Sequence, residues 1–107
     1  MTKAKVFAVH PGEILREEFM KPFGISSNRL AKELHISAPR VNDIVLERRS
    51  VTADTAVRLG MFFGTGPELW MNLQSTYDIR QAKASKLLKS IKPLSKEALS
   101  AGYCTKS

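Results

Sequence analysis

Residues 26–50 read SSNRLAKELHISAPRVNDIVLERRS, a pattern that predicts two short helices joined by a tight turn. Leu30 and Leu34 recur at helical spacing and give the first helix one apolar face. Val41 and Ile44 do the same for the second helix. Helices this short are not stable alone, so they must pack on each other and on neighbouring helices. That packing leaves the start of the second helix projecting outward.

The projecting start of the second helix carries small and hydrogen-bonding side chains. This is the layout of a helix-turn-helix, whose second helix enters the DNA major groove by its N-terminal end. We therefore expect DNA contacts from both helix starts and from the basic loop that follows. The predicted contact residues are Ser27, Asn28, Ser37, Ala38, Pro39, Arg40, Asn42, Asp43, Arg48, Arg49 and Ser50.

Arg40 is the strongest candidate for reading a base, because arginine to guanine is the commonest specific contact. The alternatives are a phosphate contact, a solvated side chain or an ion pair with Asp43, three positions along. Asn42 can hydrogen-bond an adenine, and Asp43 can accept a hydrogen bond from a cytosine. The alternative is that both lie on a solvated helix surface. Pro39 either touches a thymine methyl group or simply starts the helix.

Side chains at the two helix starts are natural ligands for DNA phosphates. Ser27, Asn28 and Ser37 occupy these positions, although capping alone also explains the serines. Residues 48–50 are expected beside the DNA backbone of the same half-site, with a solvated loop as the alternative.

The rest of the chain predicts an all-α domain of five helices with almost no sheet, because no stretch alternates with period two. Residues 1–11 form an N-terminal arm. Pro11 and Gly12 mark a turn before the first helix, and Pro22 and Gly24 end it. The predicted caps of the next three helices are Ser26 or Ser27, then Ser37, then Thr52, with Gly64 ending the fourth helix.

The fifth helix opens at Gly66 and carries a stripe of apolar and aromatic side chains. The stripe consists of Leu69, Trp70, Leu73 and Tyr77. A core role is favoured over a ligand pocket, and part of the stripe is expected to form the seam of a homodimer. Leu87, Leu88 and Ile91 extend the pattern by two more turns, until Pro93 ends the helix.

The net charge of +7 is unevenly distributed. Residues 1–80 carry +2 and are expected to form the DNA-binding domain, whereas residues 81–107 carry +5 and form a basic helical extension with a mobile tail. This extension either adds non-specific DNA affinity or is a solvated end.

Composition excludes several classes of protein. No apolar run approaches the roughly 20 residues of a membrane span, and the N-terminus lacks the apolar region of a signal peptide, so a cytoplasmic location is expected. The single cysteine, Cys104, is expected to be a free thiol. His10, His35 and Cys104 match no metal-ligand spacing. No catalytic pair or glycine-rich phosphate loop is present, so neither an enzyme nor a cofactor is expected.

Four motifs occur in a fixed order that resembles the HigA- or VapI-type antitoxins of the lambda-repressor-like family. They are His10–Leu15 (HPGEIL), the helix pair from Leu30 to Ile44, Thr52–Ala56 (TADTA) and Pro67–Gln74 (PELWMNLQ). The resemblance covers roughly residues 7–80. His35 departs from the pattern, because this family prefers glycine in the turn, where a positive φ is easily adopted.

The resemblance implies a dimeric DNA-binding antitoxin that neutralises a small ribonuclease toxin and represses its own operon at a palindromic operator. The N-terminal arm with the first helix, or the C-terminal tail, would bind the toxin. A stand-alone transcription regulator without a toxin is the main alternative. A protein-interaction module that has lost its DNA function is a third.

Overall fold

The first helical stretch runs unbroken from Pro11 to Phe23 in the computed structural model, which describes residues 9–95. It consists of α2 (Pro11–Ile14), a π-helical segment η1 (Leu15–Met20) and α3 (Lys21–Phe23). Gly24 ends it in the left-handed conformation, as predicted, but Pro22 lies inside it and does not end it. The wider π turn explains the difference: the Lys21 N–H bonds the Arg16 carbonyl five residues back, and Pro22 falls in the opening turn of α3, where a missing N–H is tolerated.

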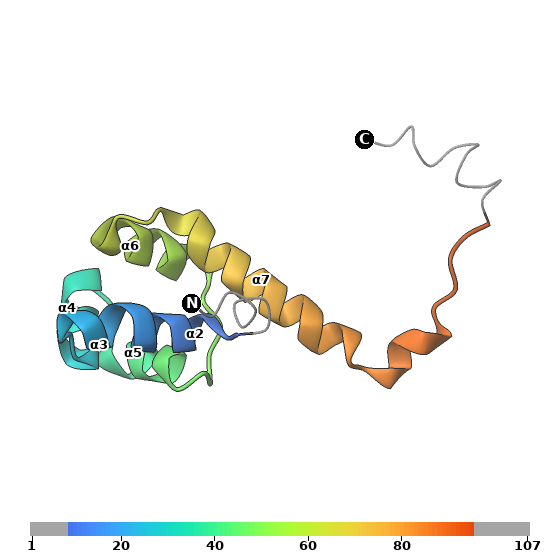
Figure 1. The fold of residues 1–107 in the computed structure, drawn as a ribbon, viewed down its shortest axis with the longest axis horizontal. Coiled ribbons are helices and arrows are strands. Elements are labelled where there is room, and N and C mark those ends of the chain that lie inside the picture. Colours follow the sequence, from blue (N-terminus) through green and yellow to red (C-terminus); the bar gives the residue numbers. More distant parts are fainter. Residues whose placement is uncertain (1–8, 96–107) are drawn as a thin grey trace.

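The next two helices are the predicted pair, α4 (Ser27–Leu34) and α5 (Ala38–Val45). α6 (Ala53–Phe63) and α7 (Pro67–Lys83) follow and pack against each other (Figure 1). Counting Pro11–Phe23 as one helix, the described part of the chain has five main helices and no strand, which confirms the predicted all-α fold.

One core holds the five helices together. Every helix contributes at least one side chain that is almost fully buried, as expected from the apolar spacing. These side chains are Leu15, Leu30, Ile44, Leu59 and Trp70. The turn between α6 and α7 lies close against α6, because a Cβ on Gly60 would collide with the backbone of Gly66.

The stripe on α7 is mainly a core feature. Trp70 and Leu73 are buried, and the Trp70 indole N–H donates to the Thr65 hydroxyl at 2.9 Å. The Trp70 ring lies 5.1 Å from that of Phe19. The predicted core role of these two residues is therefore confirmed, while the dimer seam stays a prediction.

Beyond Asp78 the chain leaves the core and projects as an extension (Figure 1). α7 ends at Lys83, and a short 3-10 helix, η2 (Lys86–Ser90), follows. The predicted continuation of the fifth helix toward Pro93 is therefore wrong. Ser85 adopts an extended backbone and its hydroxyl accepts the Leu87 N–H at 3.3 Å, a local bond that competes with a continued helix.

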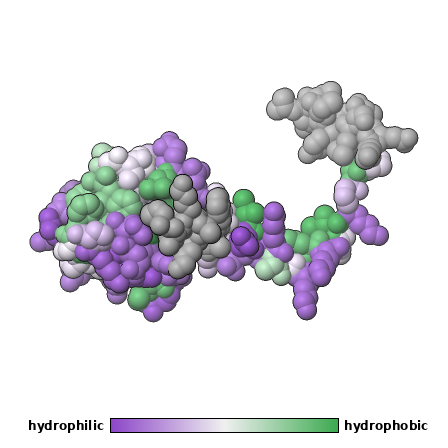
Figure 2. Space-filling view, in the orientation of Figure 1, coloured by the Kyte–Doolittle hydropathy of each residue, from purple (hydrophilic) through white to green (hydrophobic). Residues whose placement is uncertain are grey.

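Figure 2 shows apolar residues exposed along this extension. Leu87 and Ile91 are 82% and 70% exposed. No helix in residues 9–95 combines the length and apolar character that crossing a membrane requires. Cys104, most of the N-terminal arm and the end of the basic tail lie outside the described residues.

Candidate DNA-binding surface

The turn between α4 and α5 depends on one residue with a left-handed backbone. His35 has φ 60° and ψ 42°, the conformation that glycine adopts most easily. Its N–H bonds the Lys32 carbonyl at 3.3 Å, and the next N–H, of Ile36, bonds the Ala31 carbonyl at 3.1 Å. These bonds close the end of α4 and direct the chain into α5.

Serine caps begin both helices of the pair. The Ser26 hydroxyl accepts the Arg29 N–H at 3.1 Å, so Ser26, and not Ser27, is the cap of α4. The Ser37 hydroxyl accepts the Arg40 N–H at 3.3 Å and caps α5, as predicted. Ser27 then occupies the first turn of α4, facing α5.

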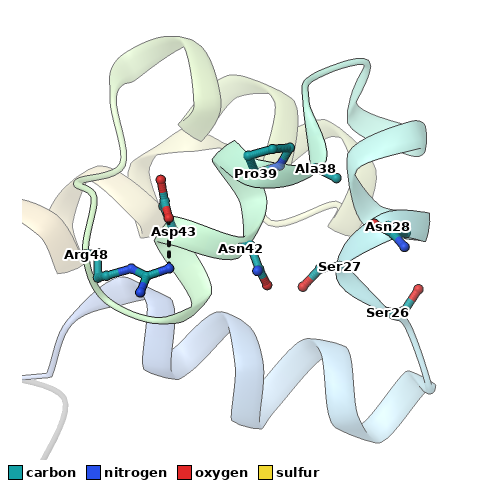
Figure 3. Close-up of a pocket in the computed structure, with 8 residues that line it drawn as sticks. All are labelled: Ser26, Ser27, Asn28, Ala38, Pro39, Asn42, Asp43 and Arg48. Atoms are coloured by element: carbon teal, nitrogen blue, oxygen red, sulfur yellow. Dashed lines mark hydrogen bonds and ion pairs between the residues drawn. The ribbon is translucent and has the colours of Figure 1, made fainter.

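An open hollow of about 520 Å³ lies between the two helix starts (Figure 3). Its lining residues are Ser26, Ser27, Asn28, Ala38, Pro39, Asn42, Asp43 and Arg48. Seven of these eight were predicted as DNA contacts from the sequence, and Ser26 was predicted only as a possible cap. Of the other predicted contacts, Ser37, Arg40, Arg49 and Ser50 do not line the hollow.

One carboxylate pairs with two arginines at the edge of the hollow, which leaves a net positive charge there. The Asp43 carboxylate lies 3.2 Å from Arg48 and 3.7 Å from Arg49. Figure 3 shows the first of these ion pairs bridging from α5 to the following loop. The pairs hold both arginines beside α5, where hydroxyl, amide and guanidinium groups together can donate to phosphates and base edges.

Arg40 points elsewhere. Its guanidinium Nη2 donates to the Thr55 hydroxyl at 2.8 Å and lies 3.4 Å from the Asp54 carboxylate, both in the first turn of α6. The Arg40–Asp43 pair considered from the sequence is not formed, because Asp43 pairs with Arg48 instead. Arg58 also donates to Asp54. This hydrogen bond is the largest influence on the pKa of the Asp54 carboxyl, and it lowers that pKa.

The other end of α5 is fixed by the first helix. The Arg16 guanidinium donates to the Val45 carbonyl at 2.5 Å and lies 3.4 Å from Glu47, whose φ is 64°. A Cβ on Gly12 would overlap the Ile44 carbonyl oxygen, so glycine lets the first helix approach α5 closely. The HPGE motif is the sequence feature that could have indicated the close packing of Gly12 on α5. Nothing in the local sequence indicates that Arg16 bonds Val45.

His10 has a structural role in the same region. Its Nδ1 accepts the Gly12 N–H at 2.8 Å and caps the first helix, and its ring lies 4.9 Å from Tyr77. Burial is the largest influence on the pKa of this imidazole and lowers it, while Glu47 and Asp78 oppose the shift. Within residues 9–95 no three potential metal ligands are grouped together.

Comparisons with known proteins agree with this geometry. No family model matches the chain. It is 50% identical over 97 residues to Virulence-associated protein I of Dichelobacter nodosus, with 90% of each chain covered. It is 32% identical over 96 residues to Antitoxin HigA-1 of Vibrio cholerae, covering 88% of this chain and 90% of the relative. The solved structure of Pseudomonas aeruginosa antitoxin HigA with the higBA promoter has 49% identity and a TM-score of 0.78, covering 82% of this chain and 99% of that one.

Proposed function

The chain belongs to the HigA- and VapI-type family of helix-turn-helix antitoxins, and from this premise we propose that it represses its own operon and neutralises a ribonuclease toxin. Proteins of this family are DNA-binding antitoxins and regulators, not enzymes.

The observation that carries the DNA part is the hollow between the starts of α4 and α5. The related Pseudomonas aeruginosa HigA was solved with a promoter, and this chain shares its fold. We place Asn42 and Pro39 against base edges and Ser27, Asn28 and Ser37 against phosphates. Arg48, Arg49 and Ser50 lie in the loop beside the same half-site.

A homodimer would present two such surfaces to DNA. Two reading helices about 34 Å apart require a palindromic operator. We propose that the half-buried part of the α7 stripe, Leu69 and Tyr77, contributes to the seam, because Trp70 and Leu73 are already used in the core.

The toxin part rests on family membership. A small ribonuclease that cuts messenger RNA on the ribosome is neutralised sterically, by being covered or held away. This activity belongs in the cytoplasm, where operators and ribosomes are found. We propose two candidate surfaces for the toxin: the N-terminal arm with the first helix, and the C-terminal extension, where Leu87 and Ile91 are exposed.

The proposal is tested with the small open reading frame next to this gene. That neighbour is expressed alone and with the antitoxin, growth is followed, and the two proteins are tested for co-purification. Expression alone is expected to stop growth, and co-expression to restore it. A harmless neighbour that does not bind would favour the stand-alone regulator.

Asn42→Ala separates the two activities. It removes an exposed amide from the DNA-facing hollow and should weaken operator repression while leaving growth rescue intact. Asn72→Ala, on the exposed side of α7, is the matched control and should alter neither activity. Loss of growth rescue in Asn42→Ala would contradict the assignment of this surface to DNA alone.

A further inference from the structure

The TADT motif at residues 52–55 has no part in the proposed DNA contacts, yet it binds the arginine predicted to read a base. The Nη2 atom of Arg40 lies 2.8 Å from the Thr55 hydroxyl oxygen, 3.4 Å from Asp54 and 3.5 Å from the Thr52 hydroxyl oxygen. These contacts tie the first turn of α5 to the first turn of α6.

A second arginine extends this connection to α4. Arg58 Nε donates to the Asp54 carboxylate at 2.9 Å, and its Nη1 donates to the Leu34 carbonyl at 2.8 Å. Asp54 thus lies between two guanidinium groups. Through them, the end of α4, the start of α5 and the start of α6 are joined at the helix-turn-helix.

The Arg40 side chain points away from the hollow, which agrees with a role in contacts within the protein. From α5, the hollow is lined by Ala38, Pro39, Asn42 and Asp43. At 3.6 residues per turn, Arg40 is roughly a third of a turn away from the side that these residues share. Its partner Thr55 is 1% exposed, so Thr55 is out of reach of DNA.

We propose that Arg40, Asp54 and Thr55 form a positioning network that sets the pose of the DNA-facing start of α5. This inference rests on the proposed operator binding. Arg40 then acts on operator affinity through the orientation of its neighbours Asn42 and Asp43. Hydrogen bonds to charged groups are among the stronger ones, so breaking the network is expected to weaken operator binding about five- to tenfold.

The test compares Arg40→Ala, Thr55→Val and the double variant. Thr55→Val removes the hydroxyl that accepts from Arg40 and keeps the side-chain volume nearly unchanged. Operator affinity is measured by fluorescence anisotropy over a salt series, and on operators with single base-pair changes, at a temperature where circular dichroism shows every variant folded. Arg80→Ala and Thr76→Val on α7 are the matched controls.

The network predicts that both single variants lose affinity to a similar degree on every operator and that the double variant is no weaker than either one. The salt dependence should stay unchanged, because no phosphate contact is removed. Thr55→Ser, which keeps the hydroxyl but loses a buried methyl group, should lower stability yet retain wild-type affinity.

Three results would overturn the network. The first is a loss in Arg40→Ala confined to one base pair, which indicates base reading. The second is a salt slope reduced by about one unit, which indicates a phosphate contact. The third is an affinity that follows stability instead of the Thr55 hydroxyl. A wild-type chain with no operator preference overturns the proposed function and, with it, the DNA role of the network.

Discussion

The Gln74 side-chain oxygen on α7 accepts the backbone N–H of Val51 at 2.7 Å, with both residues buried. Val51 lies in the segment between α5 and α6, so this bond fixes the chain that follows the DNA-facing helix. The Gln74 amide nitrogen in turn donates to Asp78 at 2.9 Å. Each polar atom of this buried side chain thus has a hydrogen-bond partner.

Gln74→Leu should destabilise the protein, because the buried Val51 N–H loses its acceptor. The expected loss is about 1–3 kcal/mol of unfolding free energy. Urea unfolding followed by circular dichroism measures it, with Gln81→Leu on the exposed end of the same helix as the control. Equal midpoints for the two variants would show that the bond contributes nothing.

Stability should also depend on pH through His10. Burial lowers the pKa of this imidazole below its usual value near 6.5, so the unfolded chain binds the proton more readily than the folded one. The contribution of His10 is therefore full above about pH 6.5 and declines as the pH falls below it. Protonation also removes Nδ1 as the acceptor for the Gly12 N–H.

His10→Asn provides the comparison for this effect. Asparagine is a good helix cap that does not titrate. Between pH 7 and pH 5 the wild type should lose more unfolding free energy than this variant, as measured by denaturant titration. Parallel pH profiles for the two proteins would exclude the histidine as the source.

His35→Gly should stabilise the protein by up to about 1 kcal/mol, because glycine adopts a φ of 60° without steric cost. Thermal unfolding measures the change. Glu33→Gly in the last turn of α4 is the control, and it should lower stability by a similar amount. A lower melting temperature for His35→Gly would mean that the imidazole makes a larger contribution than the backbone strain.

Removing residues 85–107 tests the role of the basic extension. The cut follows α7, which ends at Lys83, so the helix itself is preserved. If the lysines touch DNA phosphates, the slope of log affinity against log salt should become shallower by about 0.9 for each phosphate that the shortened chain no longer neutralises. An unchanged slope would mean that the extension is a solvated end or serves another partner.

The features predicted correctly from the sequence are those set by local chemistry. Ser37 and Thr52 cap helices because their hydroxyls accept an N–H three residues along, and Gly64 ends α6 with a φ of 73°. The predicted contacts Asn42 and Asp43 line one hollow because their positions on a short helix determine which way they face, while their contact with DNA stays a prediction.

The features that sequence reasoning missed depend on contacts between distant segments. Local spacing suggests Asp43, three residues along, as an ion-pair partner for Arg40, but the Arg40 guanidinium donates to Thr55, fifteen residues along. Arg16 reaches Val45 across 29 positions. Pro22 lies inside the first helix and does not end it, because a π turn precedes it. No pattern in the local sequence indicates such a turn. Side-chain reach in the folded state decided the two arginine cases, and backbone geometry decided the case of Pro22.

Whether the α4–α5 surface reads an operator is measured by titrating the full chain with two DNA duplexes at physiological salt. One carries the palindrome upstream of its own gene, and the other carries the same bases shuffled. We expect at least about a 10³-fold preference for the palindrome, and a smaller preference in Asn42→Ala. Equal affinity for both duplexes would contradict it.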